Sequence, residues 1–111
     1  MRIVFMGTPD FAAASLKKMI EEDYEIAGVF TQPDRPKGRG MHFAASPVKE
    51  LALAHGIPVF QPLKLRDETA LESLRALSPE LIVVAAYGKI LPSSVLGLPP
   101  SGCLNAHASI L

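Results

Sequence analysis

The sequence predicts an open, doubly wound α/β fold, in which helices cover both faces of a parallel sheet. Short, continuously apolar runs alternate along the chain with segments whose apolar residues recur at helical spacing. Between successive runs there is no dipeptide of the kind that closes a two-residue hairpin, so parallel pairing with helical crossovers is favoured. The 111 residues suffice for one hydrophobic core, and we expect a single domain over residues 1–111.

The first half of the chain supplies two strands and two helices. Its opening apolar run stops at Gly7, which is typical of a strand buried on both faces, and Thr8 then offers a helix cap with Pro9 in the first turn. A second run, rich in β-branched and aromatic residues, precedes a stretch of proline, glycine and charge, after which Ser46 and Pro47 restart a helix. The predicted elements are a strand over 3–6, a helix over 9–22, a strand over 24–31, a loop over 32–45 and a helix over 46–56.

The second half repeats this alternation. Leu71, Leu74 and Leu77 recur at helical spacing, and the run that follows is wholly apolar with a β-branched centre, which makes it the strongest strand signal. The predicted elements are a strand over 58–61, a helix over 67–77, a strand over 81–86, one or two helical turns over 93–96 and a strand over 103–107. The order predicts a Rossmann-like sheet, and because its fifth strand would have an uncovered edge, we expect a domain truncated after that strand.

Charge and composition exclude several classes of function. Eleven Lys and Arg balance eleven Asp and Glu, so no overall field attracts nucleic acid or a membrane, and a charged partner must be met locally. The single cysteine, Cys103, cannot form an internal disulfide or a multi-thiolate metal site, which fits a reducing compartment. The apolar start of the chain is too short for a signal peptide or a membrane span. We therefore expect a cytoplasmic monomer that binds neither membrane nor DNA and holds no metal.

The loop over 32–45 carries the first candidate site. Arg35, Lys37 and Arg39 stand against Asp34, so three positive charges minus one negative charge leave a local excess of two. A solvated loop is the ordinary explanation of such a run. However, connections between a strand and a helix usually take about two to six residues. The greater length of this loop, together with its charge, favours contact with phosphate.

A row of polar side chains ends the predicted fifth strand. Asn105, His107 and Ser109 are two residues apart, so in an extended chain they project to the same side and present an amide, an imidazole and a hydroxyl. This set suits stabilisation of an oxyanion and transfer of a proton in acyl-transfer chemistry. The alternative is structural, with Asn105 capping a turn and His107 buried in the core.

The segment after the strongest strand is predicted to face the same crevice. In a doubly wound sheet the fourth strand lies beside the first, where the strand order reverses, and the fifth strand lies next to the fourth. The segment is either a loop anchored in the core or one wall of a site for a flat heterocycle. Its residues are Tyr87, Gly88, Lys89, Ile90 and Leu91.

Six segments of the chain closely resemble the methionyl-tRNA formyltransferase family. They are RIVFMGTPDF (2–11), VFTQPDRPKGRG (29–40), SPVK (46–49), VFQP (59–62), VVAAYGKILP (83–92) and NAHASIL (105–111). The resemblance implies transfer of the formyl group of 10-formyltetrahydrofolate to the α-amino group of methionine carried by initiator tRNA, without a metal or a nicotinamide cofactor.

The resemblance also implies roles for individual residues. It makes Asn105 and His107 catalytic and places Ser109, Ile110 and Leu111 against the folate, with Ile110 at a position where the family's motif has leucine. The family's later catalytic aspartate and its tRNA-binding barrel have no counterpart in these 111 residues, so we expect part of a longer chain that is inactive alone. The alternatives are a formyltransferase that acts on a small amine and a non-catalytic folate-binding module, and the long basic loop favours the tRNA enzyme over the former.

Overall fold

The computed structural model describes residues 1–36 and 43–106, and it confirms the predicted parallel sheet. Neighbouring strands pair in parallel in the order β5-β2-β1-β6-β7, so the order reverses between β1 and β6 as expected. The strands of this sheet are β1 (Arg2–Gly7), β2 (Glu25–Phe30), β5 (Val59–Phe60), β6 (Leu81–Ala85) and β7 (Cys103–Asn105).

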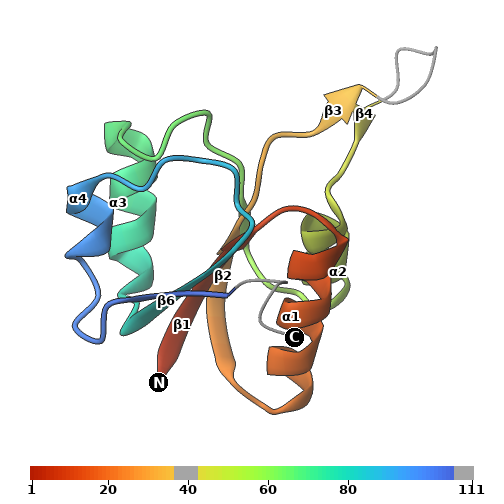
Figure 1. Ribbon diagram of the computed structural model, residues 1–111, viewed down its shortest axis with the longest axis horizontal. Coiled ribbons are helices and arrows are strands. Elements are labelled where there is room, and N and C mark those ends of the chain that lie inside the picture. Colours follow the sequence, from red (N-terminus) through yellow and green to blue (C-terminus); the bar gives the residue numbers. More distant parts are fainter. Residues whose placement is uncertain (37–42, 107–111) are drawn as a thin grey trace.

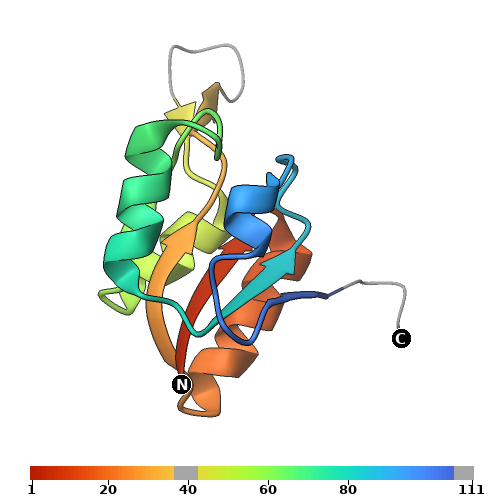
Figure 2. The ribbon, with the colours of Figure 1, turned by 90° about the vertical axis from the view of Figure 1, so that its left-hand side faces the viewer.

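Helices cover both faces of the sheet, as Figures 1 and 2 show. On one face lie α1 (Asp10–Glu21) and α2 (Pro47–Ala54), and on the other lie α3 (Glu68–Leu77) and α4 (Ser93–Leu96). Successive side chains of a strand point to opposite faces, and β1 therefore contributes to two cores. Val4 and Met6 pack with residues of α3 and α4, whereas Ile3 and Phe5 pack with residues of α1 and α2. No helix in the described ranges is long and apolar enough to cross a membrane.

Gly7 allows the first strand and the first helix to meet closely. A Cβ atom at this position would lie 2.6 Å from the Cβ of Ala12 in α1 and 2.7 Å from the carbonyl oxygen of Ala85 in β6. Neither atom belongs to a flexible side chain that could turn aside. The chain therefore makes a tight strand-to-helix turn at Gly7, which brings α1 close to the carboxyl ends of β1 and β6.

The two predicted helix caps have different outcomes. Ser46 caps α2 as expected, because its Oγ accepts a hydrogen bond from the backbone N–H of Lys49 at 3.1 Å. The cap predicted at Thr8 is wrong: Pro9 occupies the N-cap position of α1, and no side chain caps the helix. The physical reason is competition, since the Thr8 hydroxyl donates instead to the carbonyl oxygen of Tyr87 at 3.0 Å.

The long loop contains secondary structure that the sequence did not predict. β3 (Arg35–Pro36) pairs antiparallel with β4 (Phe43–Ala44), and Figure 1 shows this pair projecting beyond the sheet. The prediction of an uninterrupted loop over 32–45 is therefore wrong at these positions. A missing hairpin dipeptide argues only against two-residue turns, and longer connections do not need one. The other predicted bounds shift by a residue or two, as element ends commonly do.

Candidate functional site

Hydrogen bonds to two backbone carbonyl groups, those of Tyr87 and Gly88, link the carboxyl ends of β1, β2 and β6. The Thr8 hydroxyl, after β1, donates to the Tyr87 oxygen at 3.0 Å. The Nε2 atom of Gln32, after β2, donates to the carbonyl oxygens of Tyr87 and Gly88, at 3.3 Å in each case. The backbone N–H of Gln32 also donates to the Thr8 hydroxyl at 3.4 Å. One short segment after β6 thus receives hydrogen bonds from both neighbouring connections.

This segment leaves β6 through a strained turn. Ala86 and Gly88 both have left-handed backbone, with φ angles of 52° and 82°. Glycine adopts this region readily, whereas alanine pays roughly 1–2 kcal/mol for it. Between them, Tyr87 is buried in the core beneath α3 and α4. Backbone strain of this kind concentrates at functional sites, where the surroundings hold the chain in place.

A cavity of about 360 Å³ lies beside this turn, and we call it the β6–β7 cavity. It joins the turn to the end of β7, so the crevice predicted from the strand order is present, and Asn105 stands exposed at its edge. The Ile90 side chain is not part of it, because that side chain is 90% exposed and lines a neighbouring hollow. The lining residues are Phe11, Val84, Ala86, Tyr87, Gly88, Lys89, Leu91, Asn105 and Ala106.

Several predicted site residues lie outside the described residues. These are His107, Ser109, Ile110 and Leu111 at the end of the chain, and Lys37 and Arg39 in the basic loop. Of the predicted residues that are described, the structure brings together Tyr87, Gly88, Lys89, Leu91 and Asn105 in one cavity wall.

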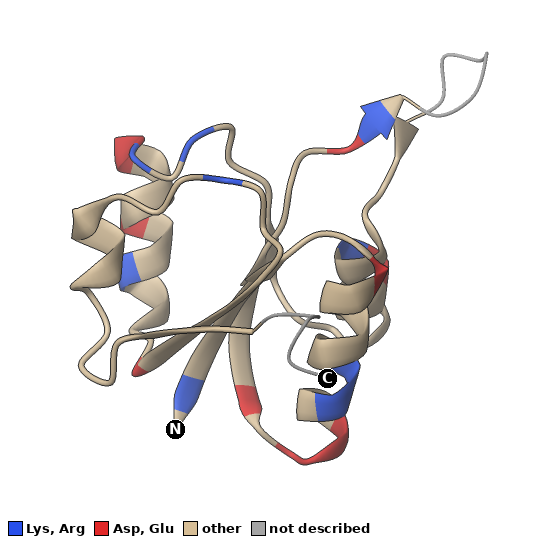
Figure 3. Ribbon diagram, viewed as in Figure 1, with Lys and Arg blue, Asp and Glu red and all other residues tan. Residues whose placement is uncertain are grey.

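A second cavity, of about 370 Å³, adjoins the first and carries positive charge. It shares Gly88 and Lys89 with the β6–β7 cavity and adds Lys64 and Arg66 from the connection that follows β5. Figure 3 shows basic segments on the loops at this end of the sheet. Sequence reasoning missed Lys64 and Arg66, because two cations in a loop carry no local signal of the cavity that the fold places beside them.

The base of the basic loop is anchored by a second cluster of hydrogen bonds. The carboxylate of Asp34 accepts from Gln61 Nε2 at 2.7 Å and pairs with Lys49 Nζ at 3.1 Å. The hydrogen bond from Gln61, followed by that from Lys49, lowers the pKa of Asp34 below its ordinary value. Asp34 thus forms its ion pair with Lys49. The nearby Arg35 instead donates from Nη2 to the neutral side-chain oxygen of Gln32 at 3.0 Å.

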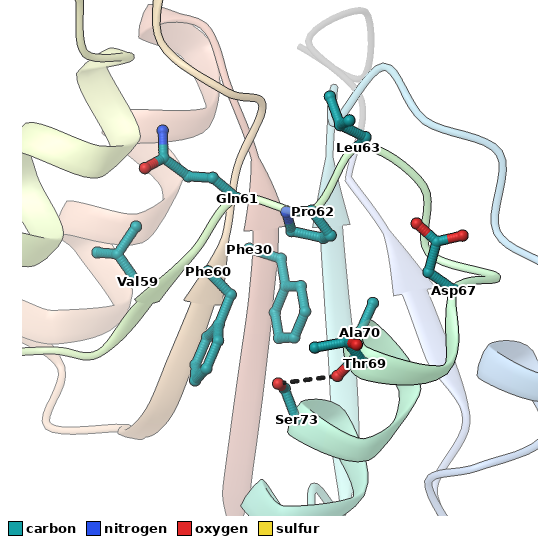
Figure 4. A pocket seen from close by; sticks show the side chains of 10 residues that line it. All are labelled: Phe30, Val59, Phe60, Gln61, Pro62, Leu63, Asp67, Thr69, Ala70 and Ser73. Atoms are coloured by element: carbon teal, nitrogen blue, oxygen red, sulfur yellow. Dashed lines mark hydrogen bonds between the residues drawn. The ribbon is translucent and has the colours of Figure 1, made fainter.

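A third cavity, of about 510 Å³, is a poorer candidate for a polar reaction (Figure 4). It lies between α3 and the chain after β5, beside the stacked rings of Phe30 and Phe60, whose centroids are 5.0 Å apart. Two of its polar side chains are already used: Ser73 donates to a carbonyl within α3, and Gln61 donates to Asp34. None of the residues proposed from the sequence lines it.

Two titratable groups near the site, the Tyr87 phenol and the Cys103 thiol, are held in their neutral forms by burial. Burial raises the pKa of Tyr87 to about 12, and its hydroxyl lacks a hydrogen-bond partner in the described part of the chain. Burial also raises the pKa of the Cys103 thiol, which therefore stays protonated rather than reactive. Across residues 1–36 and 43–106, no three His, Cys, Asp or Glu side chains gather as a metal site would require.

Comparison with known proteins places these features in a family. The family model described as formyl transferase matches residues 1–111. Methionyl-tRNA formyltransferase from Clostridioides difficile (strain 630) is 55% identical over 111 residues, and that from Marinobacter nauticus (strain ATCC 700491 / DSM 11845 / VT8) is 58% identical over 111 residues. Both alignments cover 100% of this chain and 36% of the relative, so the chain spans about 36% of the length of these relatives.

A solved structure shares the fold. The crystal structure of phosphoribosylglycinamide formyltransferase from Streptococcus pneumoniae TIGR4 aligns with a TM-score of 0.60, covering 94% of this chain and 54% of that chain. At 20% identity this likeness supports the architecture alone. The match of the family model along the whole chain goes further, and it confirms the resemblance seen in the sequence: the chain belongs to the formyl transferase family.

Proposed function

We propose that this chain forms part of an enzyme that transfers the formyl group of 10-formyltetrahydrofolate to the α-amino group of methionyl initiator tRNA. The observation that carries the proposal is the β6–β7 cavity, which joins Asn105 to the strained turn at Ala86–Gly88. Relatives that are 55% and 58% identical to this chain are named methionyl-tRNA formyltransferases, which supports the choice of substrate.

The two adjoining cavities suit the two ends of a folate. The volume of the β6–β7 cavity falls in the range of roughly 300–1,000 Å³ that small-molecule sites occupy. Phe11 and Leu91 offer apolar surface to a flat ring, and the backbone of the turn offers donors and acceptors to its polar edge. In the adjoining cavity, Lys64, Arg66 and Lys89 suit the carboxylates at the other end of the molecule.

Within this arrangement Asn105 acts on the transition state. Bound in the cavity, 10-formyltetrahydrofolate would supply an activated formyl group. Attack by the methionyl amine on the formyl carbon would place negative charge on its oxygen, and the Asn105 amide is proposed to donate a hydrogen bond to that oxygen. Collapse of this intermediate would break the bond between the formyl carbon and the folate nitrogen, and that nitrogen would take up the proton that the amine loses. The resemblance assigns a second donor, protonated His107. A donor aimed at developing charge lowers the barrier because it gains strength in the transition state.

The basic loop is proposed to contact the acceptor stem of the tRNA. Its base is fixed by the pairing of Asp34 with Lys49 and Gln61, at the same end of the sheet as the turn that lines the β6–β7 cavity. Arg35 is exposed there, and its hydrogen bond to a neutral amide leaves its positive charge uncompensated by that contact. Lys37 and Arg39 are proposed as further phosphate contacts on the basis of the sequence.

Folate binding is tested by hydrogen exchange in a chimera in which residues 1–111 replace the matching segment of the Clostridioides difficile relative. We expect tetrahydrofolate to slow exchange at residues 86–91 and 105–111, because backbone groups there contact the ligand. Protection confined to other segments would overturn the proposed site.

The substrate is tested in the same chimera by offering initiator methionyl-tRNA and, separately, a small amine such as glycinamide ribonucleotide. Formyl transfer to the tRNA is expected, and transfer to the small amine alone would favour the small-amine alternative. The 111-residue chain assayed by itself is expected to show no significant turnover. Turnover near the rate of the chimera would show that these residues contain every catalytic group.

A further inference from the structure

We propose that Gln32 is a positioning residue that couples RNA binding at the basic loop to folate binding at the turn after β6. The inference rests on the proposed function and deepens it, because it assigns communication between the two substrates to one side chain. The observation behind it is that Gln32 contacts both the first basic residue of the loop and the backbone of the cavity wall.

The neighbours of Gln32 fix the orientation of its side-chain amide. Nε2 donates to the carbonyl oxygens of Tyr87 and Gly88, and Oε1 accepts from Arg35 Nη2. Turning the amide over would place its oxygen against two carbonyl oxygens and its NH₂ group against a guanidinium, which are both repulsive contacts. The amide therefore has one favoured orientation, in which it bridges the loop and the turn.

The close approach of Gln32 to the turn depends on the absence of a side chain at Gly88. A Cβ atom there would overlap Gln32 Nε2, and the φ of 82° is also unfavourable for other residues. On the opposite side, the backbone carbonyl of Gln32 accepts from Gln61 Nε2 at 3.2 Å. The amide is thus held between the anchored base of the loop and the cavity wall.

The bridge predicts the sign of the coupling. An arginine guanidinium has five N–H donors, so Arg35 can keep its contact with Gln32 while other donors meet a phosphate. RNA that holds Arg35 thereby also restrains Gln32 and, through it, the carbonyls of Tyr87 and Gly88. A turn ordered in this way loses less conformational entropy when folate binds, so each substrate should tighten the binding of the other by the same factor.

The test measures the Kd of tetrahydrofolate for the chimera with and without saturating initiator methionyl-tRNA, a pair that cannot turn over because no formyl group is present. In the unsubstituted chimera we expect tRNA to tighten folate binding by about 5-fold or more, the lower end of ordinary coupling between sites. Gln32→Glu keeps an acceptor for Arg35 but sets an anionic oxygen against the carbonyls of Tyr87 and Gly88, so the factor should fall to about 1. Gln32→Ala removes both contacts and should do the same.

Ser73→Ala is the control, because it removes a side-chain hydrogen bond within α3 that contacts neither Gln32 nor the turn after β6. We expect this variant to retain the coupling. Coupling that is absent in the unsubstituted chimera, or that survives both Gln32 substitutions, would overturn the inference. The RNA contact is checked separately by Arg35→Ala. Unchanged tRNA affinity in this variant would reject Arg35 as an RNA contact and the coupling with it. Weakened tRNA affinity in this variant, together with no coupling in the unsubstituted chimera, would reject the role of Gln32 alone.

Discussion

Replacement of Gly7 by alanine tests whether close packing at the end of β1 positions the site. The added Cβ would meet the Cβ of Ala12 at 2.6 Å, the carbonyl oxygen of Ala85 at 2.7 Å and the ring of Phe5 at 2.9 Å, all closer than real Cβ contacts. At least two of these three contacts can be relieved only by shifting α1 or β6. Overpacking of this kind typically costs about 1–3 kcal/mol, and the rigid neighbours place Gly7→Ala at the upper end, near 3 kcal/mol.

The assay is urea unfolding of the 111-residue chain, read as the midpoint at constant slope. Gly97→Ala is the matched control, because a Cβ atom there meets its nearest atom, the carbonyl oxygen of Ser93, at an ordinary 3.5 Å. We expect that control to change the free energy of unfolding by less than about 0.5 kcal/mol, as surface substitutions usually do. A Gly7→Ala variant as stable as the Gly97→Ala variant would refute the steric reasoning.

Three further predictions concern charge. Replacing Arg35, Lys37 and Arg39 by alanine in the chimera should raise KM for tRNA. It should also make the slope of log K for tRNA binding against log salt concentration shallower by roughly two to three, since each lost phosphate contact removes about 0.7–0.9 from that slope. An unchanged slope would mean that the loop is merely solvated. The pKa of Asp34 lies below its ordinary value of 3.8, so its contacts stabilise the fold above that pH and are lost as the pH falls through the lower folded value. Asp34→Asn should therefore flatten the acid side of a plot of the unfolding midpoint against pH. An acid side identical to that of the unsubstituted protein would contradict this. Burial raises the pKa of the Tyr87 phenol from 10.0 to about 12, so the fold loses stability as the pH rises above 10. Tyr87→Phe should abolish that alkaline loss, and at pH 7 it should leave the stability equal or higher by about 1 kcal/mol, because the buried hydroxyl has no hydrogen-bond partner in the described residues. Urea unfolding at pH 7 and above pH 10 measures both effects.

The arrangement of the sheet and the location of the candidate site could be predicted from the sequence. The alternation of apolar runs with helical spacing implies parallel strands, and parallel strands in this order leave a crevice where the order reverses. That rule predicted that Tyr87 and Asn105 face one crevice although they lie in separate segments of the chain, and both residues line the β6–β7 cavity. The apolar pattern of β1 likewise predicted burial on both faces, because every residue from Ile3 to Met6 had to find a core.

The hydrogen bonds that fix the site could not be predicted in the same way. Thr8 has the local pattern of a helix cap, yet its hydroxyl bonds to Tyr87, which is 79 residues away. Gln32 contacts residues 55 and 56 positions further along the chain, and nothing in its immediate sequence marks it as a bridge. Local patterns report propensity and burial, whereas these contacts depend on where the fold brings distant strand ends together. The pairing of β3 with β4 escaped prediction for a related reason, since two-residue strands leave too little pattern to detect.

The most direct test of the central claim is kcat for formyl transfer to initiator methionyl-tRNA by the chimera with Asn105→Ala, and in parallel with His107→Ala. If these side chains stabilise the oxyanion, kcat should fall by about 10²-fold or more in each variant, because removal of one such donor typically costs that much. The Kd of tetrahydrofolate, measured alongside, should change far less. Near-normal kcat in both variants would contradict the proposal and leave Asn105 and His107 with structural roles alone.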